Sequence, residues 1–183
     1  MNDERQISRL SKQLAKNLPR PTPDNPRELL HSICTQLAEE RNRTVRLMFR
    51  TFPPQTVSGL WLKLPDEDLI IVEENTGWFH QLVILGHEIW HMVSGRGAGC
   101  LAHHHGGEQH VVAAARALSE DFDLQEVIDL VEIAARTSVD ATDEESTAER
   151  AGLAIATAVR RAMHSSGAPR YGLAGRIEQS LGG

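Results

Sequence analysis

The chain has 183 residues, of which 40% are hydrophobic and 24% charged, and its formal net charge at pH 7 is −6. This composition is typical of a single soluble globular domain with a real hydrophobic core. No apolar run is long enough to span a membrane, and the charged N-terminus, MNDERQISRLSKQLAK, lacks the apolar segment of a secretory signal. We therefore expect a cytoplasmic protein that does not enter membranes.

Charge is unevenly distributed along the chain. Residues 1–50 carry a balance of +4 and the remainder a balance of −10. Because the basic residues are scattered among acidic ones, and no recognition helix is apparent, the sequence disfavours direct binding to nucleic acid. The two cysteines, Cys34 and Cys100, lack the spacing of a redox or zinc motif, so we expect free thiols.

The first 26 residues predict a helix followed by a linker. Apolar spacing indicates a short amphipathic helix over residues 1–18, and four prolines between Pro19 and Pro26 then favour extended backbone. Asp24 or Asn25 can cap a second helix, which begins at Pro26 and ends near residue 41. The sequence thus predicts three parts: an N-terminal helix and linker, a main domain and a loosely held tail (1–25, 26–165 and 166–183).

Three short segments rich in β-formers follow the second helix, at residues 44–49, 58–64 and 68–74. Their spacing predicts a small antiparallel sheet of three strands. From residue 77 the pattern is helical, with Asn75 or Thr76 as the cap of a helix that ends near Ser94. Further helices are predicted at residues 108–118, 122–136 and 143–163. The fold class is therefore α+β, with the small sheet packed on helices.

The helix predicted at residues 77–94 contains the sequence LGHEIWH. His87 and His91 lie four residues apart, so both imidazoles can face one metal ion. Glu88 lies about 100° round the helix from His87 and can reach a water molecule on that ion. His-Glu-x-x-His is the signature of zinc hydrolases, in which two neutral imidazoles bind Zn²⁺ and the glutamate removes a proton from the activated water.

The residues around this motif are almost all apolar, which predicts a central, buried helix. Buried polar groups need partners, and a metal ion would supply one. The alternative is a buried His–Glu pair that is satisfied by hydrogen bonds alone.

A catalytic zinc ion usually has three protein ligands. The candidates for the third ligand are Glu145, Glu149, the triplet His103–His105, His110 and His80. Glu145 and Glu149 lie one turn apart on a predicted helix with small residues on one face, which would let that helix approach closely. One of the two can bind the metal while the other accepts the spare N–H of a ligand histidine. His80, one heptad before His87, could instead touch a substrate near the cleft.

The order of these features resembles the ImmA/IrrE family of metallopeptidases over about residues 27–161. The matching positions are the segment Thr76-x-x-x-His80-Gln81, the motif His87-Glu88-x-x-His91 and the segment Glu145-Ser-Thr-Ala-Glu149. The resemblance implies a zincin-like active-site helix and one Zn²⁺ per chain, bound by His87, His91 and Glu145. It also implies Glu88 as the general base and Glu149 as an acid that supports a ligand.

By this resemblance the protein would be a zinc metalloendopeptidase that cleaves a helix-turn-helix repressor or an antitoxin. An extended substrate could add to an exposed sheet edge, which we expect at the strand of residues 68–74. The alternative is a non-catalytic regulatory protein of the toxin–antitoxin type, with a structural or vestigial metal site.

Overall fold

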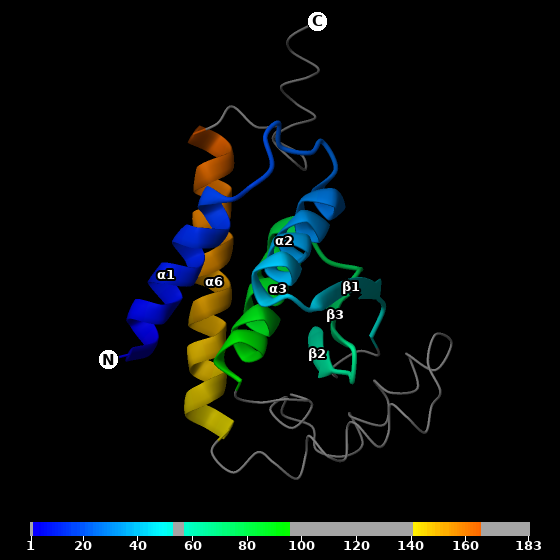
Figure 1. Cartoon of the computed structure of the whole chain (residues 1–183), viewed down its shortest axis with the longest axis vertical. Coiled ribbons are helices and arrows are strands. Elements are labelled where there is room, and N and C mark those ends of the chain that lie inside the picture. Colours follow the sequence, from blue (N-terminus) through cyan, green and yellow to red (C-terminus); the bar gives the residue numbers. More distant parts are fainter. Residues whose placement is uncertain (1, 53–56, 96–140, 166–183) are drawn as a thin grey trace, which may run out of the picture.

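The computed structural model describes residues 2–52, 57–95 and 141–165. These residues form four helices and one three-stranded sheet (Figure 1). In chain order the elements are α1 (Asn2–Lys16), α2 (Pro26–Arg41), β1 (Thr44–Arg50), β2 (Gly59–Lys63), β3 (Glu67–Glu73), α3 (Trp78–Ser94) and α6 (Ala141–Ser165). None of these helices is both long and apolar enough to cross a membrane. The helices predicted at 108–118 and 122–136, Cys100 and the tail 166–183 lie outside the described residues.

The sheet is mixed, so the prediction of an antiparallel sheet was wrong. The strand order is β1–β3–β2, with β3 antiparallel to β2 and parallel to β1. A short turn joins β2 to β3, where the Leu64 N–H donates to the Glu67 carbonyl, and this turn dictates a hairpin. The chain between β1 and β2 is longer. It allows β1 to pair with the far side of β3 instead of extending a meander.

The central position of β3 also corrects the predicted site of peptide addition. Both of its edges are already paired, so it offers no free edge to an extended substrate. Residues 68–72 of β3 are all buried, as expected for a central strand covered on both faces, whereas burial alternates along β1. Of the two outer strands, β2 makes the more extensive contact with α3.

The helices lie in successive layers beside the sheet. α2 packs on β1, and α3 packs on β2 and β3. α6 lies along α3, and α1 lies along the outer side of α6 (Figure 1). Ile7, Leu10 and Leu14 of α1 are buried in the same hydrophobic core as the sheet. The first and last described helices are therefore neighbours.

Two helix starts show how local sequence fixes the ends. Asn25 caps α2, and its side-chain oxygen accepts the Arg27 N–H at 2.9 Å, as predicted. The cap of α3 is Gly77 and not Asn75 or Thr76, and it makes no side-chain hydrogen bond. Asn75 is engaged elsewhere, because its amide donates to the Thr51 hydroxyl at 2.8 Å.

A fully buried carboxylate, that of Asp68, closes one end of the sheet. Trp61 Nε1–H donates to its Oδ1 at 3.1 Å, and Arg43 Nε–H donates to its Oδ2 at 3.1 Å. Arg41 lies 3.6 Å from the same Oδ2. The Arg43 guanidinium also bonds the carbonyls of Leu64, Pro65 and Glu67 in the β2–β3 turn. Both oxygens of this buried charge are thus paired, as burial requires.

Candidate metal centre

The candidate site begins with two histidines on one face of α3. This helix is central because its flanking residues are apolar, and it ends where Gly95 takes the left-handed conformation (φ 68°). His91 is buried, with 1% of its side chain exposed, and the side chain of His87 is 13% exposed. Their Nε2 atoms lie 3.0 Å apart. The helix thus holds the two imidazoles side by side, with their Nε2 atoms accessible to a further group.

Glu145 of α6 supplies that group. Its Oε1 lies 3.0 Å from His87 Nε2, and its Oε2 lies 3.6 Å from His91 Nε2. Together these three residues form a set whose ligand atoms all lie within 4.8 Å of one another. Among the described residues it is the one group that could hold a metal ion. The structure therefore brings together the three residues predicted as ligands.

A contact between two glycines brings α6 close enough to α3 for this arrangement. A Cβ built on Gly86 would lie 3.1 Å from the Cα of Gly152. A Cβ on Gly152 would lie 2.6 Å from the Val83 carbonyl oxygen and 3.1 Å from the His87 nitrogen. Since these obstacles are backbone atoms, a side chain here would force the helices apart. Gly152 lies about two turns from Glu145, so the glycine contact sets the reach of that carboxylate.

The arrangement of His87, His91 and Glu145 suits binding to a metal ion better than hydrogen bonding among the three side chains. A neutral imidazole nitrogen offers one hydrogen or one lone pair, yet His87 Nε2 lies 3.0 Å from both His91 Nε2 and Glu145 Oε1. Glu145 Oε2 is buried without a hydrogen-bond partner. Ligands about 2.0–2.1 Å from a tetrahedral zinc ion would lie roughly 3.3 Å apart. The two separations of 3.0 Å, from His87 Nε2 to His91 Nε2 and to Glu145 Oε1, are close to that value, and His91 Nε2 lies 3.6 Å from the other carboxylate oxygen, Oε2.

The members of this group shift each other's pKa. Burial is the largest influence on His87 and opposes its charge, but the hydrogen bond to Glu145 and three nearby carboxylates outweigh it, so its pKa is raised above 6.5. Burial is also the largest influence on Glu145. The hydrogen bonds and charges of His87 and His91 outweigh it, and the pKa of Glu145 is lowered below 4.5. A metal ion at His87 would therefore compete with a proton that Glu145 helps to hold there.

Glu88 lies beside this group, between α3 and the first residue of β2. Its side chain is almost fully buried, and its Oε2 has no hydrogen-bond partner. Its charge is among those that raise the pKa of His87. A Cβ on Gly59 would lie 2.7 Å from Glu88 Oε1, so a side chain at position 59 would clash with this carboxylate. Glu88 thus has the room and the free oxygen that a proton acceptor needs.

The remaining predicted residues lie at different distances from the centre. Glu149 is exposed and is not one of the three grouped residues, although its charge contributes to the raised pKa of His87. His80 is exposed in the first turn of α3, two turns before His87. His103–His105 and His110 lie outside the described residues.

Two glycines at the site, Gly59 and Gly86, were not singled out from the sequence. An isolated glycine within a strand or a helix pattern is a signal of close backbone approach. Gly59 precedes a strand-forming run and Gly86 immediately precedes His87, so both carried that signal. Their partners, Glu88 and Gly152, are visible only in three dimensions.

We compared the chain with protein-family models, with curated proteins and with solved structures, and no match to it was found.

Proposed function

We propose that this protein is a zinc-dependent metallopeptidase of the type that the ImmA/IrrE resemblance implies. The observation that carries the proposal is the convergence of His87, His91 and Glu145, beside a buried glutamate that has a free oxygen. Two nitrogen donors and one carboxylate are a ligand set used by catalytic zinc sites, which keep one position open for chemistry. In this proposal the three ligand residues bind the metal ion and Glu88 transfers protons.

The three ligand residues would hold the ion and Glu88 would handle protons. When bound, zinc supplies Lewis acidity, which polarises a carbonyl and lowers the pKa of water. Glu88 Oε2 would accept a proton from the attacking water and return it to the departing amine. Glu88 Oε2 makes no hydrogen bond, so its lone pairs are free to accept a proton.

The outer edge of β2 is a suitable place for the peptide. β2 pairs with β3 on one side, and its other edge has no strand partner among the described residues. Its first residue, Gly59, lies against Glu88. An extended chain that added to this edge would therefore pass the proton acceptor. This assignment replaces the edge originally expected at β3.

The proposed substrate is a protein, namely a helix-turn-helix repressor or an antitoxin. The support for this class of substrate is the resemblance stated above. The same resemblance supports a role for Glu149, which would accept a hydrogen bond from a ligand histidine. The rival candidate is a regulatory binding protein whose metal site is structural. The two candidates differ in whether hydrolysis depends on Glu88.

The decisive experiment compares the wild-type chain with Glu88→Gln. Both proteins are loaded with zinc, their metal content is measured, and each is incubated with a proteome-derived peptide library that is read by mass spectrometry. We expect equal zinc content and a loss of cleavage of about 10²–10⁴-fold in Glu88→Gln, since a general base is removed. Glu28→Gln, which removes an exposed carboxylate of α2, serves as the control. Zinc binding with no cleavage that depends on Glu88 would favour the regulatory protein, and no zinc binding would contradict both.

A further inference from the structure

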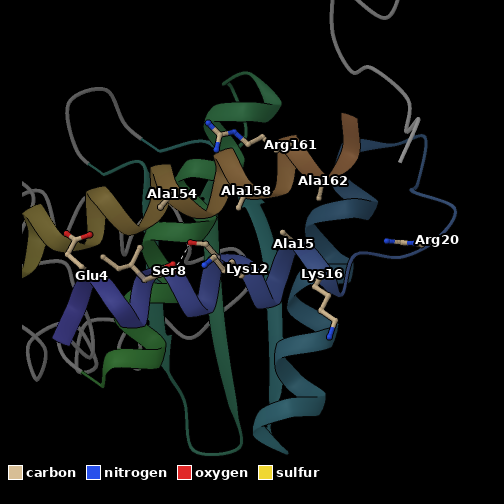
Figure 2. A pocket seen from close by; sticks show the side chains of 12 residues that line it. Glu4, Ser8, Lys12, Ala15, Lys16, Arg20, Ala154, Ala158, Arg161 and Ala162 are labelled. Atoms are coloured by element: carbon tan, nitrogen blue, oxygen red, sulfur yellow. Dashed lines mark hydrogen bonds between the residues drawn. The ribbon is translucent and has the colours of Figure 1, made fainter. Parts of the chain in front are cut away.

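A groove runs between α1 and α6 on a different face of α6 from the metal ligands. Its volume is about 660 Å³. Figure 2 shows the side chains that line it. Ala154, Ala158 and Ala162 form its wall on α6, at four-residue intervals. Figure 2 shows these alanines facing Ala15 and the polar residues of α1. Glu145 and Gly152 lie elsewhere on the helix, towards α3.

The shape of this groove suits a helix. Alanines at i, i+4 and i+8 leave a shallow channel along α6, into which the side-chain ridge of another helix can pack. The wall on α1, from Glu4 to Lys16, is about 18 Å long, which equals roughly three turns of a partner helix. A β-strand would gain little here, because the backbone groups within both helices are already bonded to one another. A membrane surface is a poor fit too, since the apolar residues are recessed and do not protrude.

The charges around the groove are not balanced. Lys12 and Lys16 lie one turn apart on α1 (Figure 2), and Arg161 of α6 also lines the groove, with its guanidinium directed away from α1. Arg20 adds a fourth cation at the same end. None of the four forms an ion pair with another described residue.

Among the described residues, the one acidic residue that lines the groove is Glu4, at the other end, and it is already engaged. Its carboxylate lies 3.3 Å from Arg150 Nε. The groove therefore presents a half-buried alanine wall and a basic end whose charge no other described residue compensates, although the chain as a whole carries a net charge of −6.

We propose that this groove binds an acidic amphipathic helix of a partner protein. Small apolar side chains of that helix would pack on the alanine wall, and its carboxylates would meet Lys12, Lys16, Arg20 and Arg161. Complementary charge of this kind sets orientation and speeds association more than it adds affinity. The proposal is independent of the metal centre, because the two sites lie on different faces of α6.

The test uses the full chain and a fluorescent helical peptide of about twelve residues, with Ala and Leu on one face and Glu on the other. A peptide with Lys in place of Glu is the matched probe. We expect the acidic peptide to bind more tightly than the basic one and to weaken as salt is raised. The alanine methyl signals of residues 154, 158 and 162 should shift in NMR spectra as that peptide is added.

Two double charge reversals on α1 then locate the binding site. Lys12→Glu with Lys16→Glu should raise the Kd of the acidic peptide by about tenfold or more. Arg5→Glu with Arg9→Glu makes the same change of charge at exposed positions that do not line the groove, and should alter the Kd by less than about twofold. Ala158→Leu, which fills the groove without altering charge, should also weaken binding.

Several results would overturn the proposal. These are equal binding of the two peptides, no binding at about 1 mM peptide, and equal effects of the two double reversals. Preferential binding to vesicles of anionic phospholipid would assign the basic end to a lipid surface. A dimer in sedimentation experiments that is dissociated by the Lys12→Glu/Lys16→Glu pair would make a second copy of the chain the occupant.

Discussion

The protein buries carboxylates in two regions and treats them in opposite ways. At the end of the sheet, both oxygens of Asp68 have partners in Trp61 and the arginines of positions 41 and 43. At the metal group, Glu145 of α6 and Glu88 of α3, which lies against β2, each keep one buried oxygen without a hydrogen bond. A buried oxygen without a hydrogen bond costs free energy, so the free oxygens of Glu88 and Glu145 do not stabilise the fold as the hydrogen-bonded oxygens of Asp68 do. The contrast separates a carboxylate that holds the fold together from carboxylates that are kept ready for an incoming group.

The largest expected effect is that of replacing Glu145, one of the carboxylates with a buried oxygen that makes no hydrogen bond. Glu145→Gln should weaken zinc binding by at least about 100-fold, because it removes an anionic ligand from the group. A competition titration with a chromophoric zinc chelator measures the loss. The free energy of unfolding of the metal-free protein should change by less than about 1 kcal/mol. Unchanged zinc affinity would remove Glu145 from the ligand set, and Glu149→Gln would then be the variant to measure.

The second prediction concerns the close approach that brings Glu145 to the histidines. Gly152→Ala places a Cβ against the Val83 carbonyl and the His87 nitrogen, so it should cost about 2 kcal/mol of unfolding free energy and weaken zinc binding. Chemical denaturation and the same chelator titration provide the two readouts. Gly77→Ala is the control, because a Cβ there meets nothing within 4 Å. Tight zinc binding in Gly152→Ala would show that the glycine contact does not position Glu145.

The third prediction tests the satisfied carboxylate. Asp68→Asn should lower the free energy of unfolding by about 1.5 kcal/mol, less than a fully buried ion pair would cost, because both arginines remain partly in water and Arg43 keeps its carbonyl partners. Zinc affinity should not change. Glu67→Gln, which breaks a half-exposed pair with Arg46, should cost about 0.5 kcal/mol or less. If Asp68→Asn impaired zinc binding as much as Glu145→Gln, the division between the two regions would fail.

The smallest effect is a dependence on pH. The raised pKa of His87 makes its pairing with Glu145 stabilising below pH 6.5, and this contribution is lost as the pH rises through the pKa of His87 in the folded protein. The lowered pKa of Glu145 contributes above pH 4.5 and is lost as the pH falls through its folded value. The stability difference between wild type and Glu145→Gln without metal should therefore be largest between about pH 4.5 and 6.5, at about 1 kcal/mol or less. Denaturation curves across this range measure it, and a difference that grew above pH 7 would contradict the assignment.

Zinc affinity should follow the opposite trend above this window. It should rise with pH as His87 loses its proton, because the metal and the proton compete for the same nitrogen. The chelator titration repeated at several pH values tests this. Glu145→Gln is the reference variant, because it lacks the carboxylate that raises the pKa of His87.

Much of the local structure could be predicted from the sequence, because local signals determine it. The cap residue Asn25 and the following Pro26 fix the start of α2, and alternation and apolar runs place each end of the three strands within one residue of the observed end. Sheet order was not predictable in this way. It depends on which side of β3 the chain from β1 reaches, and the unbroken apolar run Leu69–Val72 was the one hint that β3 is central.

In the candidate site, too, the part set by local sequence was predictable and the part set by contacts between distant segments was not. Helical spacing alone brings His87 and His91 together, since they are one turn apart. The choice between Glu145 and Glu149 depends on how α6 packs against α3, which the contact of Gly86 with Gly152 determines. Spacing within one helix cannot reveal such a contact between segments that are distant in sequence.

The packing of α1 against α6 has a consequence for synthesis of the chain. The apolar face of α1 finds its partner only when residues 141–165 have left the ribosome, more than a hundred residues later. At about 5–20 residues per second, that interval lasts on the order of ten seconds. During this time Ile7, Leu10 and Leu14 lack their final neighbours, and Glu145 has not yet joined the histidines. A nascent chain stalled before α6 would therefore expose the apolar face of α1 and carry an incomplete metal group.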